Sequence, residues 1–144
     1  MEPDITKKCK LKCEIVTPEG LKYDDCAIMV VVPGKIGELG ILPRHAPIVS
    51  RTVIGKVIVM GEEGSRDRFA VGDGYVKVQY DRLLLTVDTA ERASEIDVER
   101  SRKALVRAEE WMEKARHGDS SVDTNRAYSS MHRARNRLKV AGAE

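Results

Sequence analysis

The chain of 144 residues has room for one domain of average size, or for a small domain with an appended segment. Its composition is 42% hydrophobic and 33% charged, typical of a soluble globular protein, and its net charge of +2 gives no sign of nucleic-acid binding by the whole chain. No apolar run reaches the roughly 18 residues of a membrane span, and the N-terminus carries no apolar stretch typical of a signal peptide. We therefore expect a cytoplasmic protein that is held at a membrane only through partners.

The three cysteines are an odd number, which argues against a disulfide framework. Cys9 and Cys13 lie in an alternating segment that places them on one face together with Leu11 and Ile15. Four residues along a strand separate two backbones by roughly 13 Å, too far for a bridge between these two thiols. No histidine lies near them to complete a zinc site. We interpret both as small core residues.

Residues 8–89 have a β pattern, in which short apolar runs alternate with charged residues and end at Gly, Pro or Asp. Hairpins are predicted at residues 61–64 and 72–74 and near Asp81. Many short strands with frequent turns indicate a sandwich or barrel, and without a crossover helix a parallel sheet is not expected. The predicted strands are 10–17, 23–32, 53–60, 68–71, 75–80 and 82–87.

The hydrophobic period becomes helical at Glu91. Gly118 is a predicted helix C-cap and Asp123 a predicted N-cap, so two helices form a hairpin over residues 91–144, after a β domain over residues 1–90. Their narrow, alanine-rich stripes bury little apolar area, which fits a movable arm or, alternatively, an appendage without a role. The stripes are Ala104, Leu105, Ala108, Trp111, Met112 and Ala115, then Ala127, Met131, Ala134, Leu138 and Ala141.

Residues 34–50, GKIGELGILPRHAPIVS, form a loop punctuated by Gly and Pro that is too apolar for a linker facing solvent. Ile41, Leu42 and Ile48 need cover, whereas Glu38 and His45 do not belong in a core. Such a mixture on a rigid β scaffold indicates a docking surface, or alternatively a loop folded over the end of the sandwich.

This loop resembles the signature G-x-x-G-x-x-G-I-L-P-x-H-A-P of the epsilon subunit of bacterial F-type ATP synthases. The stretch FAVGDGYVKVQYDRLLLTVDTAE, from Phe69, resembles the next most typical block of that family. The resemblance covers the chain from about Lys10 to Ala141. It implies a flattened ten-stranded β sandwich followed by a C-terminal two-helix hairpin, which is more strands than the residue pattern alone predicts.

The resemblance also implies a function. The chain would be a non-catalytic subunit of the central stalk, or rotor, of a proton-translocating ATP synthase at the cytoplasmic face of the bacterial plasma membrane. The sandwich would bind the gamma subunit and the c-ring, with Glu38 facing the ring and His45 close to gamma. The helical arm would fold onto the sandwich or extend along gamma into the alpha and beta subunits of the catalytic head, where it inhibits ATP hydrolysis.

Residues 96–101, IDVERS, resemble the I/L-D-x-x-R-A motif of epsilon subunits that bind ATP as a regulatory ligand, with Ser101 in place of Ala. Independently of the motif, helical spacing aligns two rows of residues, one on each helix. In a hairpin these rows bring arginines together, which is repulsive unless an anion such as a triphosphate lies between them. The rows are Asp97, Arg100, Ala104 and Arg107, and Arg126, Ser130, Arg133 and Arg137.

The resemblance implies that ATP is bound without a required metal, although the arginines could instead contact acidic groups of the catalytic subunits. A rotor subunit without ATP binding is thus one alternative function. A nucleic-acid-binding protein is another, because residues 122–141 hold five basic residues and one acid, but only Tyr128 is interleaved with them. No glycine-rich phosphate loop or catalytic arrangement is present, so hydrolysis by this chain is not expected. The implied ATP contacts are Glu91, Ile96, Asp97, Arg100, Arg107, Arg133 and Arg137.

Overall fold

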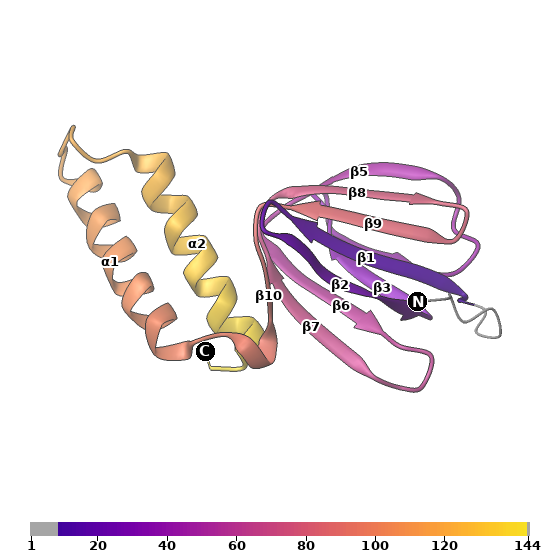
Figure 1. Cartoon of the computed structure of the whole chain (residues 1–144). Helices are drawn as coiled ribbons and strands as arrows, with labels where there is room; N and C mark the ends of the chain where they lie inside the picture. Colours follow the sequence, from indigo (N-terminus) through magenta and orange to yellow (C-terminus); the bar gives the residue numbers. More distant parts are fainter. Residues whose placement is uncertain (1–8, 144) are drawn as a thin grey trace.

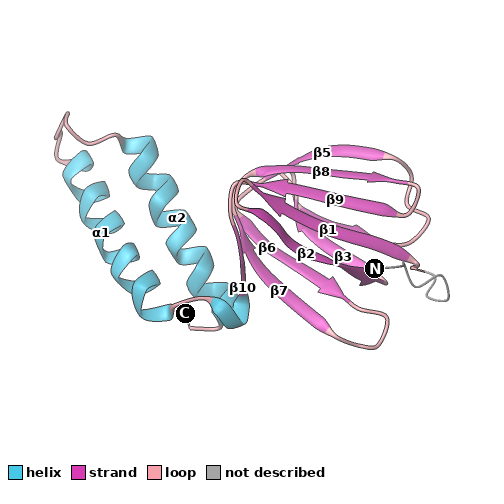
Figure 2. Cartoon of the chain, in the orientation of Figure 1, coloured by secondary structure: helices cyan, strands magenta, loops and turns pink. Residues whose placement is uncertain are grey.

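A computed structural model describes residues 9–143 and contains ten strands, a short 3-10 turn and two long helices in that range. Figure 1 shows a β sandwich with the helical hairpin beside one of its ends, and Figure 2 separates the two kinds of structure by colour. The elements are β1 (Leu11–Thr17), β2 (Gly20–Ala27), β3 (Met29–Pro33), β4 (Glu38–Ile41), β5 (Ile48–Thr52), β6 (Gly55–Met60), β7 (Arg66–Val71), β8 (Gly74–Gln79), β9 (Arg82–Val87), β10 (Ala90–Arg92), η1 (Ala93–Glu95), α1 (Val98–Arg116) and α2 (Thr124–Ala141).

The strands form two five-stranded sheets, in the orders β2-β1-β9-β8-β5 and β10-β7-β6-β3-β4. All neighbouring strands are antiparallel except β1 and β9, which pair in parallel. Strands β2 to β8 lie between these two strands in the sequence, so they supply the crossover that a parallel pair needs without a helix. The expected fold class, a ten-stranded sandwich followed by a two-helix hairpin, is confirmed.

The core between the sheets follows the alternation of the sequence. Leu11, Cys13 and Ile15 are fully buried along β1, and the alternate residues of β8 and β9 are buried in the same way. The rings of Tyr23 and Phe69 meet edge to face with centroids 5.6 Å apart. Aromatics are scarce, so aliphatic side chains fill most of this core, as the composition predicts.

The strand prediction for residues 23–32 was wrong in one respect, because this run is two strands in different sheets. The chain crosses between the sheets at Ile28, whose N–H donates to the carbonyl of Met60 (2.8 Å). The apolar run continues through the crossing because residues on both sides of it are buried. The residue pattern also missed β4, β5 and β10, which lie among glycines and prolines or at the change of period.

The interpretation of Cys9 as a core residue was also wrong. Cys9 forms a disulfide with Cys26, at the end of β2, and their Cα atoms lie 5.2 Å apart. A separation of roughly 13 Å along one strand excludes only a bridge between Cys9 and Cys13, whereas this bridge joins Cys9, just before β1, to the neighbouring strand β2. The interpretation of Cys13 is confirmed: it is a free thiol with no exposed surface.

Both helices begin at aspartates whose carboxylates accept a backbone N–H. Asp97 accepts from the N–H of Arg100 (3.0 Å), and Asp123, the predicted N-cap, accepts from the N–H of Arg126 (3.2 Å). Gly118 follows α1 with φ +84°, a conformation that glycine adopts without strain. The two-helix hairpin therefore has caps that its sequence encodes locally.

The two helices contact each other through small side chains. Ala108, Ala127 and Ala134 are buried, and Leu138 is nearly so. Trp111, which helical spacing placed on the apolar stripe, is 46% exposed, so that assignment was wrong. The alanines bring the helices too close together for a large ring to fit between them.

The hairpin touches the sandwich mainly through α2, while α1 lies on the outer side (Figure 1). A small apolar cluster of Val140, Ile96 and Ala70 is the centre of this contact. Around it, Nδ2 of Asn136 donates to the carbonyl of Gly55 (2.8 Å). The helical arm is thus docked by a few residues, as expected of a weakly held element.

No helix within residues 9–143 combines the length and apolar character needed to cross a membrane. The predicted lack of a signal peptide concerns an N-terminus whose residues 1–8 lie outside the described part of the chain.

We expect Val140→Asp to undock the hairpin, because Val140 is 1% exposed and a carboxylate there would be buried without a partner, at a cost of several kcal/mol. Hydrogen exchange should accelerate in α2, while the amides of the core strands β8 and β9 keep their protection. Lys139→Asp, an exposed change of charge in the neighbouring residue, is the matched control. Equal exchange in both variants would contradict the docking role of Val140.

Candidate functional site

A cavity of about 530 Å³ lies where α1, α2 and one end of the sandwich meet. Three separate parts of the chain form it, namely the β1–β2 turn, the segment that runs from β9 into α1, and α2. Its walls therefore depend on the docked position of the hairpin. The lining residues are Thr17, Glu19, Lys22, Asp88, Thr89, Ala90, Glu91, Glu95, Asp97, Arg100, Ser101, Ala104, Arg107 and Arg137.

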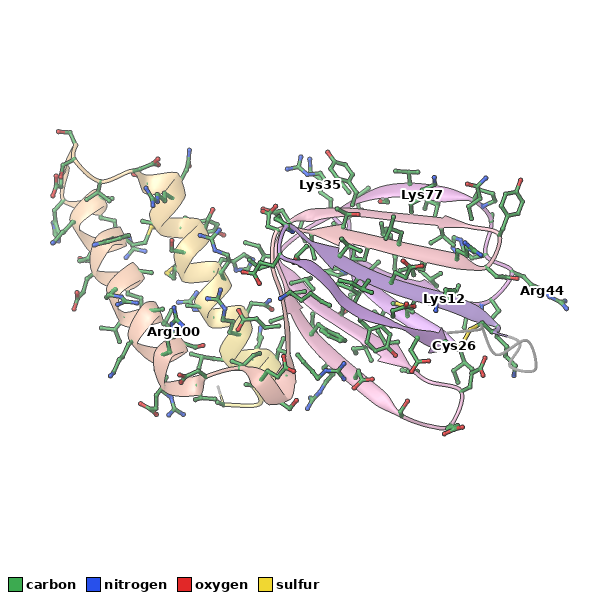
Figure 3. The ribbon with its side chains drawn as sticks, viewed as in Figure 1. Lys12, Cys26, Lys35, Arg44, Lys77 and Arg100 are labelled. Atoms are coloured by element: carbon green, nitrogen blue, oxygen red, sulfur yellow. A yellow bond between two sulfur atoms is a disulfide. The ribbon has the colours of Figure 1, made fainter. Side chains whose placement is uncertain are left out.

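Most of the residues predicted to contact ATP line this cavity. They are Glu91, Asp97, Arg100, Arg107 and Arg137, and Figure 3 labels Arg100 on α1. The other two, Ile96 and Arg133, lie outside the lining. Ile96 packs in the apolar cluster beneath the hairpin, and Arg133 borders a small adjoining hollow with Glu91 and Arg137.

Ser101 stands where the motif has alanine, and its side chain is 4% exposed. Its hydroxyl donates to the carbonyl of Asp97 (2.9 Å), one turn earlier in the helix. This bond satisfies the hydroxyl within α1, so the buried serine brings no unpaired polar group to the cavity wall.

Two ion pairs neutralise part of the cavity's charge. Nε of Arg137 lies 2.7 Å from a carboxylate oxygen of Glu91, which ties α2 to β10. Nζ of Lys22 lies 2.9 Å from Glu19 across the β1–β2 turn. The hydrogen bond between these two side chains lowers the pKa of Glu19 and raises that of Lys22. Lys22 was not predicted from the sequence, because only the folded chain brings the β1–β2 turn to the helices.

Arg100 and Arg107 differ from Arg137 because their guanidinium groups make no ion pair with any residue in the described range. They lie two turns apart on the same face of α1, Arg100 in its first turn and Arg107 at its middle, and both line the cavity, where their positive charge favours an anion. Asp97 is engaged as the N-cap and does not neutralise them by a side-chain pair. This part of the cavity can hold a phosphate group.

The second arginine row is only partly aligned with the first. Arg133 is half-buried and donates to the hydroxyl of Ser130 (3.4 Å), whereas Arg126 is exposed near the start of α2. Arg135, on another face of α2, pairs with Glu109 of α1 (3.7 Å). Glu91, which pairs with Arg137, therefore reduces the repulsion expected between the rows, whereas Glu109 pairs with Arg135 outside the second row.

The two predicted rotor-interface residues lie at different ends of the sandwich. Glu38 is exposed at the start of β4, next to the loop whose Ile36 is fully exposed. His45 lies beyond the other end of β4, next to Arg44; Figure 3 labels Lys35 and Arg44 at opposite ends of the sandwich. Nδ1 of His45 lies 2.7 Å from the carbonyl of Ala46. The structure therefore does not bring Glu38 and His45 together.

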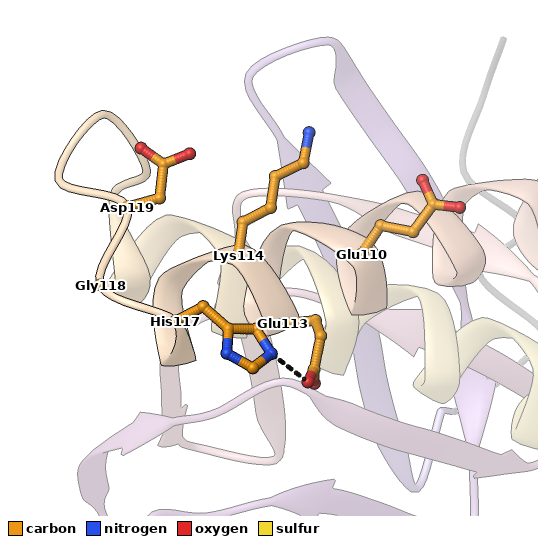
Figure 4. A pocket seen from close by; sticks show the side chains of 6 residues that line it. All are labelled: Glu110, Glu113, Lys114, His117, Gly118 and Asp119. Atoms are coloured by element: carbon orange, nitrogen blue, oxygen red, sulfur yellow. Dashed lines mark hydrogen bonds and ion pairs between the residues drawn. The ribbon is translucent and has the colours of Figure 1, made fainter.

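Another hollow, of about 580 Å³, lies at the C-terminal end of α1 (Figure 4). Its charged side chains point in different directions in Figure 4, and His117 pairs with Glu113 (Nε2–Oε1 3.0 Å). All of its lining residues are exposed, so it offers no convergent set of groups. Among residues 9–143 no group of three or more potential metal ligands is found.

The chain thus has two parts, a ten-stranded β sandwich and a docked two-helix hairpin, and arginines line the cavity between them. Two family models match this division, the ATP synthase delta/epsilon chain β-sandwich domain over residues 10–93 and the long α-helix domain of the same chain over residues 94–142. The chain belongs to the ATP synthase delta/epsilon chain family, and its resemblance to bacterial epsilon subunits is confirmed.

The ATP synthase epsilon chain of Desulforamulus reducens is 41% identical over 130 residues, which cover 90% of this chain and 96% of that one. The epsilon chain of Halalkalibacterium halodurans is 43% identical over 133 residues, covering 92% and 97%. A chain of the mitochondrial ATP synthase of Euglena gracilis, solved with its F1 part and c-ring, has the same fold. That match has a TM-score of 0.77 at 20% identity and covers 98% of this chain and 86% of the other.

Proposed function

We propose that the chain is a non-catalytic rotor subunit of a proton-translocating ATP synthase, at the cytoplasmic face of the membrane. The observation that carries the proposal is identity above 40% to epsilon chains over almost the full length of both proteins. A central-stalk and c-ring structure from Tetrahymena thermophila contains a chain of related fold, with a TM-score of 0.55 at 14% identity. In this role the chain reaches the membrane only through the complex.

We propose that the sandwich docks on the gamma subunit near His45 and on the c-ring near Glu38. Two exposed apolar side chains support this, Leu42 beside His45 (53% exposed) and Ile36 beside Glu38. The positions of Glu38 and His45 at different ends of the sandwich suit two different partners. Exposed apolar groups on rigid loops are typical of protein contact surfaces.

We expect Leu42→Asp to weaken binding to purified gamma at least about tenfold, because association would bury a carboxylate in place of an apolar contact. Surface plasmon resonance with the full chain measures the change. Val106→Asp, equally exposed at 53% but on α1, is the matched control and should bind normally. Normal binding by both variants would show that this loop does not contact gamma.

We propose that the hairpin inhibits ATP hydrolysis when it leaves the sandwich and extends toward the alpha and beta subunits. Its small apolar contact with the sandwich supports a movable arm, and its basic second helix suits an acidic surface. In the docked state the same helix places Arg137 against Glu91.

In the assembled synthase, deletion of residues 96–144 should raise ATP hydrolysis, and Val140→Asp, which undocks the arm, should lower it. Lys139→Asp is the control for the added charge next to Val140. Hydrolysis rates at low and high ATP measure both effects. Rates equal to wild type for the deletion and for Val140→Asp would refute an inhibitory arm.

We propose that the docked hairpin binds ATP as a regulatory ligand without a required metal, with phosphates at Arg100, Arg107 and Arg137. The guanidinium groups of Arg100 and Arg107, which pair with no residue within 9–143, lie in a cavity large enough for a nucleotide and support this. The ion pair between Glu91 and Arg137 would weaken, and Arg133 would reach the phosphates from the adjoining hollow. Ile96 would act indirectly, by holding the hairpin against the sandwich.

Arg100→Ala should weaken ATP binding by roughly ten- to a hundredfold, because one charge-assisted hydrogen bond contributes about 1.5–3 kcal/mol. Isothermal titration calorimetry of the full chain measures the affinity. Arg102→Ala, which removes a guanidinium paired with Glu99 outside the cavity, is the matched control. If the wild-type protein gives no heat of binding at millimolar ATP, the arginines do not bind ATP and instead form a surface that contacts a partner.

A further inference from the structure

The disulfide between Cys9 and Cys26 lies at the end of the sandwich away from the helices, where Figure 3 labels Cys26 and Arg44. Cys26 is 9% exposed, whereas Cys9 is half-buried at the edge, just before β1. The next residue, Lys10, donates its N–H to a carboxylate oxygen of Glu62 in the β6–β7 turn (3.0 Å). The bridge therefore fixes the start of β1 where the two sheets come together.

A short chain of hydrogen bonds leads from this bridge to the loop that holds His45. The N–H of Lys12, three residues after Cys9, donates to the carbonyl of Asp81 (2.9 Å). The carboxylate of the same Asp81 accepts the N–H of Arg44 (2.5 Å). Arg44 and Asp81 both have positive φ, at 65° and 57°, a conformation that non-glycine residues rarely adopt without support.

We propose that Cys9 and Cys26 form a reversible redox site, whose oxidised state clamps the start of β1 and, through Asp81, the loop around Arg44. In the reduced state the covalent tie between Cys9 and Cys26 is lost, and the Asp81–Arg44 contact opens more often. Because that loop carries His45, oxidation would stiffen the surface assigned to gamma, a consequence that rests on the proposed function. The local clamp does not depend on it.

The chemistry is thiol–disulfide exchange with a small thiol such as glutathione. A glutathione thiolate attacks Sγ of Cys9, the more exposed of the two cysteines, forming a mixed disulfide and expelling the Cys26 thiolate, which takes up a proton. A second glutathione thiolate then attacks the glutathione sulfur of the mixed disulfide, which forms glutathione disulfide and releases Cys9 as a thiolate that takes up a proton. In balance, two electrons and two protons pass from two glutathione molecules to the protein. Oxidation by a small-molecule disulfide reverses the steps.

Cys13 does not take part in this exchange. It has no exposed surface, and burial, the largest cause, raises the pKa of its thiol to about 12. Since the thiolate is the reactive form, Cys13 stays inert at neutral pH and cannot capture the bridge. Within the described residues the exchangeable pair is therefore unambiguous.

The test equilibrates the full chain in glutathione buffers of graded potential, traps free thiols by alkylation and counts them by mass spectrometry. We expect a transition of two thiols, with Cys13 unreactive on both sides. Bridging residues 17 apart in sequence should lower the unfolding equilibrium constant on the order of a hundredfold, measured by urea denaturation of the oxidised and reduced chains. Cys9→Ser should match the reduced chain, and Cys13→Ala should keep the transition.

Hydrogen exchange then tests the clamp itself. On reduction, the amides of Lys12 and Arg44 should exchange faster, while that of Ser101 in the distant hairpin should not change. Two alkylatable thiols even in oxidised glutathione would overturn the redox site. A bridge that forms without altering exchange at Lys12 and Arg44 would overturn the clamp. The wild-type comparison needs no variant, so a failure of Cys9→Ser to fold would leave the test intact.

Discussion

The contact between α2 and the end of the sandwich is the constraint on which the candidate site depends. Arg137 comes from α2, Arg100 and Arg107 from α1, and Glu91 from the sandwich, so the cavity exists only while the hairpin is docked. Docking rests on Val140 and its few apolar neighbours, one amide hydrogen bond and one partly exposed ion pair. A buried aliphatic side chain contributes about 1.5–3 kcal/mol and a screened ion pair less than about 1 kcal/mol. The docked state is therefore held by only a few kcal/mol.

The segment that joins β10 to α1 determines where the chain bends when the hairpin leaves the sandwich. Arg92 is fixed, because its guanidinium lies 2.6 Å from Asp67 and stacks over the ring of Phe69, 5.1 Å from its centroid. Beyond it, both Ala93 and Ile96 pack in the docking cluster itself. Undocking thus leaves β10 in its sheet and bends the short segment around η1. The sandwich, with a separate core, keeps its docking surfaces in both states of the arm.

Local patterns in the sequence were enough for much of the fold. Alternation identified the buried face of β1, short apolar runs located β8 and β9, and Gly118 with Asp123 marked the helix ends on the two sides of the hairpin loop. The pattern failed where two buried segments in different sheets follow one another, as at Ile28, and where β4 and β5 lie among glycines and prolines. It also placed Trp111 in an interface that alanines make too narrow. Helical spacing aligned Arg100 with Arg107, but Lys22, the Glu91–Arg137 pair and the Cys9–Cys26 bridge join distant positions that no local period reveals.

The size of the docking contact also determines whether a ligand in the cavity can shift the arm between its docked and extended positions. A ligand that binds only the docked form at a concentration a hundred times its dissociation constant adds about 2.7 kcal/mol to that form. This is comparable to the contribution of Val140 and its neighbours, so binding of moderate affinity is enough to change the balance between docked and extended arms. A larger apolar contact would hold the arm down without ligand, and a smaller one would leave no cavity to bind it. Narrow alanine stripes and a docking cluster of only a few apolar side chains thus suit a ligand-dependent arm better than a permanently fixed one.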